Sequence, residues 1–221
     1  MYKIILASAS PRRKEILQQI NVDFDVFVSD CEEVNSKTIP AEVVMELSEI
    51  KARDVYDKLQ NQHDNLIVIG SDTVVASSNN ILGKPQNRQD AYNMINEIQN
   101  NNHQVYTGVD IIVKISNYDN STLQLVNESE EFELLENKDN ILVAKANFAV
   151  STDVHVYPMT EDEINAYIDS NEPYDKAGAY AIQGMFASNI EKINGDYYNV
   201  VGLPVSKLCN VLKTIGINIV S

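Results

Sequence analysis

Hydrophobic residues along this chain alternate between the spacing of strands and the spacing of helices. Residues 2–7 fit a strand and residues 11–19 a helix, and residues 40–59 repeat apolar positions along one helical face. The continuous apolar run at 66–69 is typical of a strand that is buried on both faces of a sheet. This succession of strands and helices predicts an α/β fold.

Shorter patterns predict the connections between these elements. Residues 24–28 alternate apolar and polar positions, which predicts a half-buried strand. The run at 66–69 continues through residues 70–75, and a polar turn at 78–80 precedes Ile81-Leu82, which predicts a hairpin. The remaining predicted elements are a helix at 87–98, long strands at 105–115 and 141–157, a helix at 160–169 that opens with a capping box of Thr160 and Glu163, and a final helix with Pro204 at its first position and Gly216 at its end.

One stretch breaks this rhythm. Residues 116–140 are rich in Asn, Ser and Glu and lack clear periodicity. We interpret them as an elaborated hairpin or an acidic, exposed insertion. A functional acidic arm is the alternative to a solvated loop.

Length and charge narrow the class of protein. The 221 residues allow one large domain or two lobes that share a sheet. The 17 Lys and Arg against 32 Asp and Glu give a net charge of -15, which disfavours binding to nucleic acid. No apolar run is long enough to span a membrane and no secretory leader is visible, so we expect a cytoplasmic protein without a membrane partner. Cys31 and Cys209 are too far apart in the sequence to indicate a disulfide framework or a metal site.

The link between the first strand and the first helix carries two serines and two arginines. Ser10-Pro11 suits the first positions of a helix. A helix N-terminus directs unpaired N–H groups and the positive end of its dipole to one place, where Ser8, Arg12 and Arg13 add further donors. This combination predicts an anion site that suits a phosphate. The alternative is an ordinary capped helix with solvated arginines.

Acidic residues and a lysine form a second candidate group. Asp72 follows the buried run at 66–69, and ligands bind at the carboxyl ends of strands in α/β sheets. A carboxylate there can bind a divalent cation or act as a base toward water, whereas the alternative is a turn aspartate. Glu32 and Glu33 could hold Mg²⁺ or a water molecule, although adjacent glutamates in an acidic protein are usually just solvated. Lys51 lies near the apolar stripe of its helix, where a lysine ordinarily extends its ammonium group to solvent.

Two later segments combine small residues with a lysine. Gly83-Lys84-Pro85 places Lys84 on a rigid turn, and residues 172–184 contain Lys176, Gln183 and several small residues. Small residues allow the backbone to approach a ligand closely, and Gln183 offers both a donor and an acceptor to the edge of a nucleobase. Either segment alone could be a structural loop. Together with the N-terminal anion site, they indicate a nucleotide cleft.

These motifs resemble, in the same order, those of the Maf-like nucleoside triphosphate pyrophosphatases. The resemblance covers nearly the whole chain, except that residues 116–140 are longer and more acidic than the usual connection in that family. The six segments that carry the resemblance are residues 8–17, Lys51-Ala52-Arg53, Gly70-Ser71-Asp72-Thr73, Gly83-Lys84-Pro85, residues 172–184 and residues 193–204.

The resemblance implies a fold and a reaction. It implies a single domain over residues 1–221 with the elongated α/β fold of the Maf and inosine triphosphatase type, in which a twisted mixed sheet carries a cleft between two lobes. It further implies hydrolysis of a nucleoside triphosphate to the monophosphate and diphosphate with Mg²⁺ or Mn²⁺. A homodimer is left open.

The resemblance also implies roles for particular residues. Asp72 would be the proton acceptor that activates water for attack on the α-phosphorus, and Glu33 and Asp72 would be metal ligands. Arg13, Thr73 and Gln183 match the subgroup of the family that hydrolyses dTTP, UTP and some modified pyrimidine nucleotides. These three residues suit the carbonyl and N3–H edge of a pyrimidine. The residues that would hold the triphosphate are Ser8, Arg12, Lys51, Lys84 and Lys176.

Two classes of function stay open at this point. The first is a housecleaning pyrophosphatase that removes nucleotides before a polymerase can use them. The second is a nucleotide-binding regulator of septum formation in cell division, with which the family is also associated. Asp72 together with its cationic partners favours catalysis, because a sensor needs no base. The absence of P-loop, Rossmann, zinc-protease and serine-hydrolase motifs counts against a kinase, dehydrogenase or peptidase.

Overall fold

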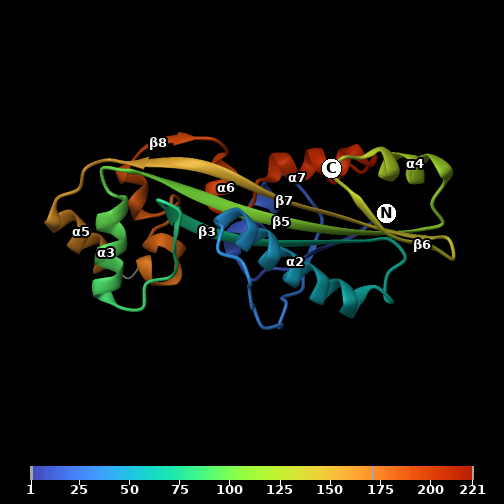
Figure 1. Cartoon of the computed structure of the whole chain (residues 1–221), viewed down its shortest axis with the longest axis horizontal. Coiled ribbons are helices and arrows are strands. Elements are labelled where there is room, and N and C mark those ends of the chain that lie inside the picture. The colour runs from blue at the N-terminus through green and yellow to red at the C-terminus, as the bar shows by residue number, and fades with distance from the viewer. Residues whose placement is uncertain (1, 171, 221) are drawn as a thin grey trace.

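A mixed β-sheet runs along the length of the molecule in the computed structural model, which describes residues 2–170 and 172–220 (Figure 1). Within these residues the main path of the sheet has the strand order β2-β1-β3-β5-β7-β6, with β4 paired to β3 and β8 paired to β7. β1 is parallel to β2 and β3, and the other pairs are antiparallel. The strands are β1 (Lys3–Leu6), β2 (Asp25–Val26), β3 (Leu66–Ser77), β4 (Asn80–Leu82), β5 (Asn102–Ser116), β6 (Glu133–Lys138), β7 (Ile141–Val156) and β8 (Ile190–Asn194).

Helices cover both faces of the sheet, and further helices gather at the end formed by α3 and α5 (Figure 1). Within the described residues, no helix is both long and apolar enough to cross a membrane. The α-helices are α1 (Pro11–Gln19), α2 (Pro40–Leu59), α3 (Arg88–Ile98), α4 (Asn120–Glu128), α5 (Glu161–Ile168), α6 (Tyr197–Val201) and α7 (Val205–Thr214), and the 3₁₀ helices are η1 (Glu172–Asp175), η2 (Ala177–Ala179) and η3 (Met185–Asn189).

Most predicted elements are confirmed. α1 and α2 begin and end at the predicted residues, and the predicted hairpin is formed by β3 and β4. The capping box of Thr160 and Glu163 at the start of α5 is present. α7 differs by one residue, because Pro204 occupies the position before the helix rather than its first turn. The predicted α/β class and mixed sheet are therefore correct.

The half-buried strand predicted at 24–28 is wrong in both length and burial. β2 contains two residues, and the side chains of Val26 and Val28 are 37% and 50% exposed. β2 lies at the edge of the sheet and pairs with β1 only through Ile5 and Leu6. A strand with one short neighbour has little surface on which to bury its apolar side, whatever its sequence pattern.

Residues 116–140 form regular structure instead of a solvated loop. They contain α4 and β6, and the side chain of Val126 is 1% exposed and that of Phe132, between the two elements, 7%. Both side chains join the core beneath α7. The predicted elaborated hairpin is confirmed, since β6 pairs in antiparallel with β7. The predicted solvated loop is wrong, because a few apolar residues anchor this stretch among the many polar residues that hide the periodicity.

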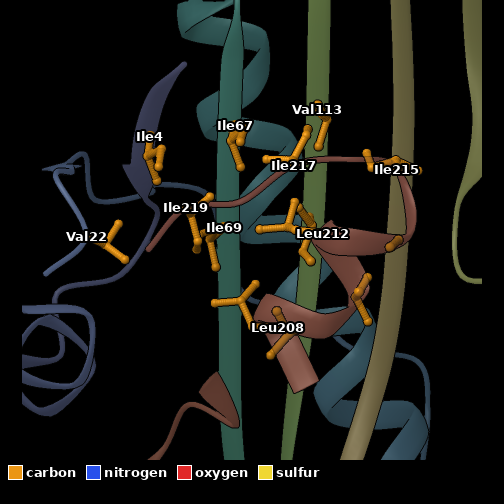
Figure 2. Packing of buried hydrophobic residues seen from close by; sticks show 14 of the residues in the cluster. Ile4, Val22, Ile67, Ile69, Val113, Leu208, Leu212, Ile215, Ile217 and Ile219 are labelled. Carbon is orange, nitrogen blue, oxygen red and sulfur yellow. The ribbon is translucent and has the colours of Figure 1, made fainter. Parts of the chain in front are cut away.

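The two faces of the sheet bury different helices. Figure 2 shows Leu208 and Leu212 of α7, followed by Ile217 and Ile219, lying against the face of the sheet that carries Ile69. On the other face, α2 packs against alternate residues of the same strands. Consecutive residues of β3 therefore point to helices on opposite faces of the sheet.

Two glycines bring α2 unusually close to the sheet. A Cβ atom at Gly70 would lie 2.2 Å from the carbonyl oxygen of Ser48, and one at Gly108 would lie 2.1 Å from that of Val44. Real Cβ atoms do not approach backbone this closely, so only glycine permits the contact. The pair fixes the height of α2 above β3 and β5.

We expect Gly108→Ala to lower the free energy of unfolding by at least about 2 kcal/mol, because the added methyl group must push α2 away from β5. Urea unfolding followed by circular dichroism measures this. Gly83→Ala is the matched control, since a Cβ there meets no atom within 4 Å. An equal loss of stability in both variants would contradict the close approach.

A buried carboxyl group lies between the same helix and sheet. Asp110 is fully buried and its Oδ2 accepts a hydrogen bond from Asn147 Nδ2 at 2.8 Å. Burial raises the pKa of Asp110 to about 7. Among the described residues, Asp110 Oδ1 and Asn147 Oδ1 are both buried acceptors without a partner. A proton on Asp110 supplies a donor that this pair of acceptors otherwise lacks.

The raised pKa gives the stability a definite pH dependence. Between pH 4 and 7 the unfolded chain has Asp110 ionised while the folded protein keeps it protonated, so this stabilisation is complete at about pH 4 and is lost as the pH rises through about 7. Asp110→Asn mimics the protonated form at every pH. We expect it to change stability little at pH 4 and to raise it by up to about 4 kcal/mol at pH 8. Urea unfolding at both pH values tests this, with exposed Asp57→Asn as the control; equal effects at both would contradict it.

Candidate active site

One edge of β3 changes partner part of the way along the strand. β1 pairs with β3 in parallel as far as Ile69, and β4 pairs with β3 in antiparallel from Val75. Between these two positions, in the part of the chain that the structure describes, no strand covers this edge, whereas the opposite edge is paired continuously with β5. Side chains from both faces of β3 can therefore reach the same opening.

A cleft of about 650 Å³ occupies this interruption of the sheet. Its walls come from the start of α1, from α2, β3 and the turn after β4, and from the segment that follows α5. Glu32 is exposed and lies outside the lining, so the structure separates it from Glu33. The residues that the sequence assigned to the site all line the cleft, namely Ser8, Arg12, Arg13, Glu33, Lys51, Asp72, Thr73, Lys84, Lys176 and Gln183.

Asp72 lies in the middle of β3, not at the end of a strand as the sequence predicted. The prediction took the end of the continuous apolar run at residue 69 as the end of the strand. The strand instead continues to Ser77, and Gly70 admits the backbone of α2. Asp72 is nevertheless accessible, because β1 has already ended at the level of Ile69.

Lys51 joins the two carboxylates of the cleft. Its Nζ lies 2.6 Å from Asp72 Oδ1 and 3.1 Å from Glu33 Oε2. The side chains of Lys51 and Asp72 are 12% and 15% exposed, whereas that of Glu33 is 53% exposed. Lys51 therefore does not extend to solvent as an ordinary helix lysine does. It compensates a largely buried carboxylate that faces the cleft.

Arg13 is the most buried cation of the site, with 8% of the residue exposed. Its Nε donates to the carbonyl oxygen of Gly202 at 2.8 Å, Nη1 to Ser8 Oγ at 2.8 Å, and Nη2 to Thr73 Oγ1 at 3.0 Å. Burial lowers the pKa of the guanidinium, and the nearby carboxylate of Asp72 acts in the opposite direction. Arg13 is thus fixed by α1, β3 and the residue after α6, and it is not a solvated arginine of a capped helix.

The N-terminus of α1 faces the cleft without the predicted cap. Ser10 has extended backbone geometry at the position before the helix, but its side chain makes no capping hydrogen bond, and Pro11 occupies the first turn. Ser8 Oγ instead accepts from the backbone N–H of Ser10 at 3.3 Å and from Arg13. Half-buried Arg12 lines the same wall. This wall combines a helix N-terminus, two guanidinium groups and a hydroxyl, which suits an anion.

The opposite wall is formed by two loops that contact each other. The backbone N–H of Gly178 donates to the carbonyl oxygen of Gly83 at 3.0 Å, which places the loop of Lys84 beside the loop of Lys176. Lys176 Nζ donates to the carbonyl oxygen of Glu172 at 3.0 Å and pairs with Asp175 at 2.5 Å, and this ion pair lowers the pKa of Asp175. Two lysines of these loops therefore line the cleft together with the wall that suits an anion.

Glu172 positions the segment that carries Gln183. Its carboxylate accepts from the backbone N–H of Met185 at 3.0 Å and from the hydroxyl of Tyr167 at 3.2 Å. A Cβ at Gly184 would lie 2.3 Å from Glu172 Oε1, so the glycine allows the carboxylate to approach. Gln183 itself is exposed at the cleft.

Buried polar residues support the site from behind. Thr107 lies outside the segments that carry the family resemblance, whereas Ser71 and Asn199 lie within two of them, although neither was given a role. Ser71 Oγ donates to the carbonyl oxygen of Gly202 at 3.3 Å, and Thr107 Oγ1 donates to that of Asn199 at 2.9 Å. Ser71, Thr107 and Asn199 are fully buried. Polar residues at the buried positions of two paired strands were the available signal, because such groups need partners.

The cleft also offers ligands to a divalent cation. Asp72 and Glu33 converge on Lys51 Nζ, so their carboxylates lie near each other. Mg²⁺ is typically bound by one or two carboxylates together with substrate phosphates. Within the described residues, no group of three or more His, Cys, Asp or Glu side chains forms a metal cage. The donor set therefore fits a cation that binds with a phosphorylated ligand.

The sequence matches one protein family over nearly its whole length. The model of the family described as Maf-like protein matches residues 3–215. A dTTP/UTP pyrophosphatase of Lachnoclostridium phytofermentans is 45% identical over 220 residues, which cover 100% of this chain and 98% of that protein. A dTTP/UTP pyrophosphatase of Agathobacter rectalis is 42% identical, with 99% and 100% of the two chains covered.

Solved structures provide a more distant comparison. A HAM1 protein from Coxiella burnetii aligns with a TM-score of 0.39 and 13% sequence identity, covering 81% of this chain and 86% of that chain.

Proposed function

The chain belongs to the family of Maf-like proteins, and on this premise we propose that it hydrolyses dTTP and UTP to the nucleoside monophosphate and pyrophosphate. The observation that carries the proposal is the pairing of Asp72 with Lys51 in a cleft whose other charged residues are mostly cationic. The full-length relatives named dTTP/UTP pyrophosphatase support the choice of substrate.

Electrostatics support a polyphosphate ligand in this cleft. The chain carries a net charge of -15, which repels an approaching triphosphate at long range. Affinity must therefore come from short contacts where cations are concentrated. We assign the triphosphate to the residues that line both walls, which are Ser8, Arg12, Lys51, Lys84 and Lys176.

We assign Asp72 as the general base. A carboxylate that faces the cleft can accept a proton from a water molecule as the water oxygen attacks the α-phosphorus. The bond from the α-phosphorus to the oxygen that bridges it to the β-phosphorus then breaks, and pyrophosphate leaves. Lys51 orients the carboxylate through the 2.6 Å contact, and the surrounding cations compensate the charge that develops on the phosphates.

A divalent cation fits the same chemistry. Glu33 and Asp72 would hold Mg²⁺ or Mn²⁺ together with phosphate oxygens of the substrate. Lys51 would then give up part of its contact with these two carboxylates and contact the substrate instead. When bound, such a cation neutralises phosphate charge and polarises the reacting groups.

We assign recognition of the base to Gln183, Thr73 and Arg13. Gln183 is exposed at the cleft and carries both a donor and an acceptor, whereas Arg13 and Thr73 are fixed to each other at 3.0 Å. Uracil and thymine present carbonyl oxygens on either side of the N3–H group, so a fixed donor beside an acceptor complements them. A cytoplasmic location would place the protein with the nucleotide pools, and a homodimer stays a prediction.

Asp72→Asn should lower kcat for dTTP and UTP by about 10²–10⁴-fold, because the amide cannot accept the proton from water. Pyrophosphate release with Mg²⁺ or Mn²⁺ measures turnover, and calorimetry measures nucleotide binding, which should persist. Asp57→Asn, on the exposed face of α2, is the control and should keep full activity. Turnover that survives in Asp72→Asn would exclude the assigned base. Nucleotide binding without turnover in the natural protein would instead favour a regulatory binding protein.

Gln183→Ala should lower kcat/KM for dTTP and UTP about tenfold, because it removes the contacts of one side chain with the base edge. A panel of dTTP, UTP, CTP, dATP and GTP measures this, and the preference for pyrimidines over purines should narrow. Gln89→Ala, at another exposed glutamine on α3, should leave the panel unchanged. An unaltered profile in Gln183→Ala would remove Gln183 from base recognition.

A further inference from the structure

A buried chain of hydrogen bonds leads from Arg13 to the backbone of α6. Arg13 Nη2 donates to Thr73 Oγ1 at 3.0 Å, and Thr73 Oγ1 lies 2.9 Å from Thr107 Oγ1. Thr107 Oγ1 in turn donates to the carbonyl oxygen of Asn199 at 2.9 Å. Thr73 lines the cleft, whereas Thr107 is completely buried behind it.

The direction of these hydrogen bonds follows from the chemistry of the groups. A backbone carbonyl can only accept, and a threonine hydroxyl has one proton to donate. Because the proton of Thr107 goes to Asn199, Thr73 must be the donor in the contact between the two hydroxyls. If Thr107 donated its proton to Thr73 instead, Thr107 Oγ1 and the carbonyl oxygen of Asn199 would face each other at 2.9 Å without a proton between them. Such a pair of unpaired acceptors is costly because Thr107 is fully buried.

The carbonyl group of Asn199, which fixes the direction of these hydrogen bonds, is held in place by the side chain of the same residue. Asn199 Nδ2 donates to the carbonyl oxygen of Val105 on β5 and to Thr152 Oγ1 on β7, both at 2.9 Å. α6 is therefore tied to two strands of the sheet through one buried side chain. The acceptor that faces Thr107 cannot turn away without breaking both hydrogen bonds.

The two hydroxyls beside Arg13 consequently present opposite groups to the cleft. Ser8 Oγ accepts from Arg13 and from the N–H of Ser10, so its own proton is free to be donated. Thr73 directs its proton inward to Thr107 and offers the cleft only a lone pair. The orientation of Thr73 is thus decided by a residue that no ligand touches.

Resting on the proposed function, we propose that Thr107 is a positioning residue that sets the specificity for the base. It holds Thr73 as an acceptor, and the N3–H group of uracil or thymine is the matching donor. The N3 atom of cytosine is an acceptor, so it would face a second acceptor at this position. Two acceptors that face each other away from water both stay without a hydrogen bond, so the site rejects cytosine strongly.

Thr107→Val tests the proposal, because it keeps the shape of the side chain and removes the hydroxyl. The proton of Thr73 is then free to turn toward the cleft and to donate to N3 of cytosine. We expect the ratio of kcat/KM for UTP to that for CTP to fall at least about tenfold. Thr107→Ser keeps the hydroxyl and should keep the ratio of the natural protein. Should Thr107→Val fail to fold, Thr107→Ala removes the same hydroxyl with a smaller side chain.

Binding separates this proposal from the proposed hydrolysis. Calorimetry with the α,β-imido analogues of UTP and CTP, which resist cleavage at that bond, gives the same ratio without turnover. If the natural protein turns over neither nucleotide but the binding ratio falls in Thr107→Val, the hydrolase assignment fails and the role of Thr107 stands. A ratio that stays unchanged without the hydroxyl, or that falls equally in Thr107→Ser, overturns the role of Thr107.

Discussion

The pairing of β3 is the constraint on which the rest of this structure depends. One edge of the strand is paired continuously with β5, while the other is shared by β1 and β4, which approach it from opposite ends. The short unpaired length between them is the place where the helix start after β1, the turn after β4 and side chains from both sheet faces can meet. Because residues alternate along a strand, Asp72 is directed to α2 and Thr73 to α1 and α6. A single strand thereby separates the carboxylate that is proposed to activate water from the residues that are proposed to recognise the nucleobase.

Burial explains how so acidic a chain can keep a cationic cleft. Arg13 is anchored by a carbonyl and two hydroxyls rather than by a carboxylate, so its charge is not cancelled by a formal partner within hydrogen-bond distance. Lys51 is different, since it is shared between Asp72 and Glu33. The site therefore contains two differently held cations. Arg13 is held by neutral groups, whereas the carboxylate partners of Lys51 can bind a divalent cation instead, and Lys51 can then contact the substrate. This division allows the charge balance of the cleft to adjust as a ligand enters.

The sequence predicted the elements whose burial follows a simple repeat. α1, α2 and the long strands each bury one continuous stripe or face, so local periodicity reports their structure well. It also predicted which residues line the cleft, because those residues lie in motifs that resemble, in the same order, the motifs of one family. It placed Asp72 at the end of a strand because the apolar run stops at residue 69, whereas β3 continues to Ser77. In residues 116–140 it predicted the hairpin but not the core contacts, because the few apolar residues that make them, such as Val126 and Phe132, are scattered among polar ones. Thr107 and the role of Asn199 were not predicted, because both depend on contacts between distant strands, which no local pattern encodes.

The hydrogen bond from Arg13 to Gly202 joins positions 189 residues apart. Ends of a chain that are so distant in sequence meet late, because the entropy of closing a loop grows with its length and the intervening strands must first find their partners. During synthesis, the helix that carries Arg13 leaves the ribosome long before its acceptor exists. The cleft is consequently completed only when nearly the whole chain has been made. A chain that ends before Gly202 lacks the carbonyl oxygen that anchors Arg13, so the wall of the cleft that Arg13 forms is fixed only after that residue has been added.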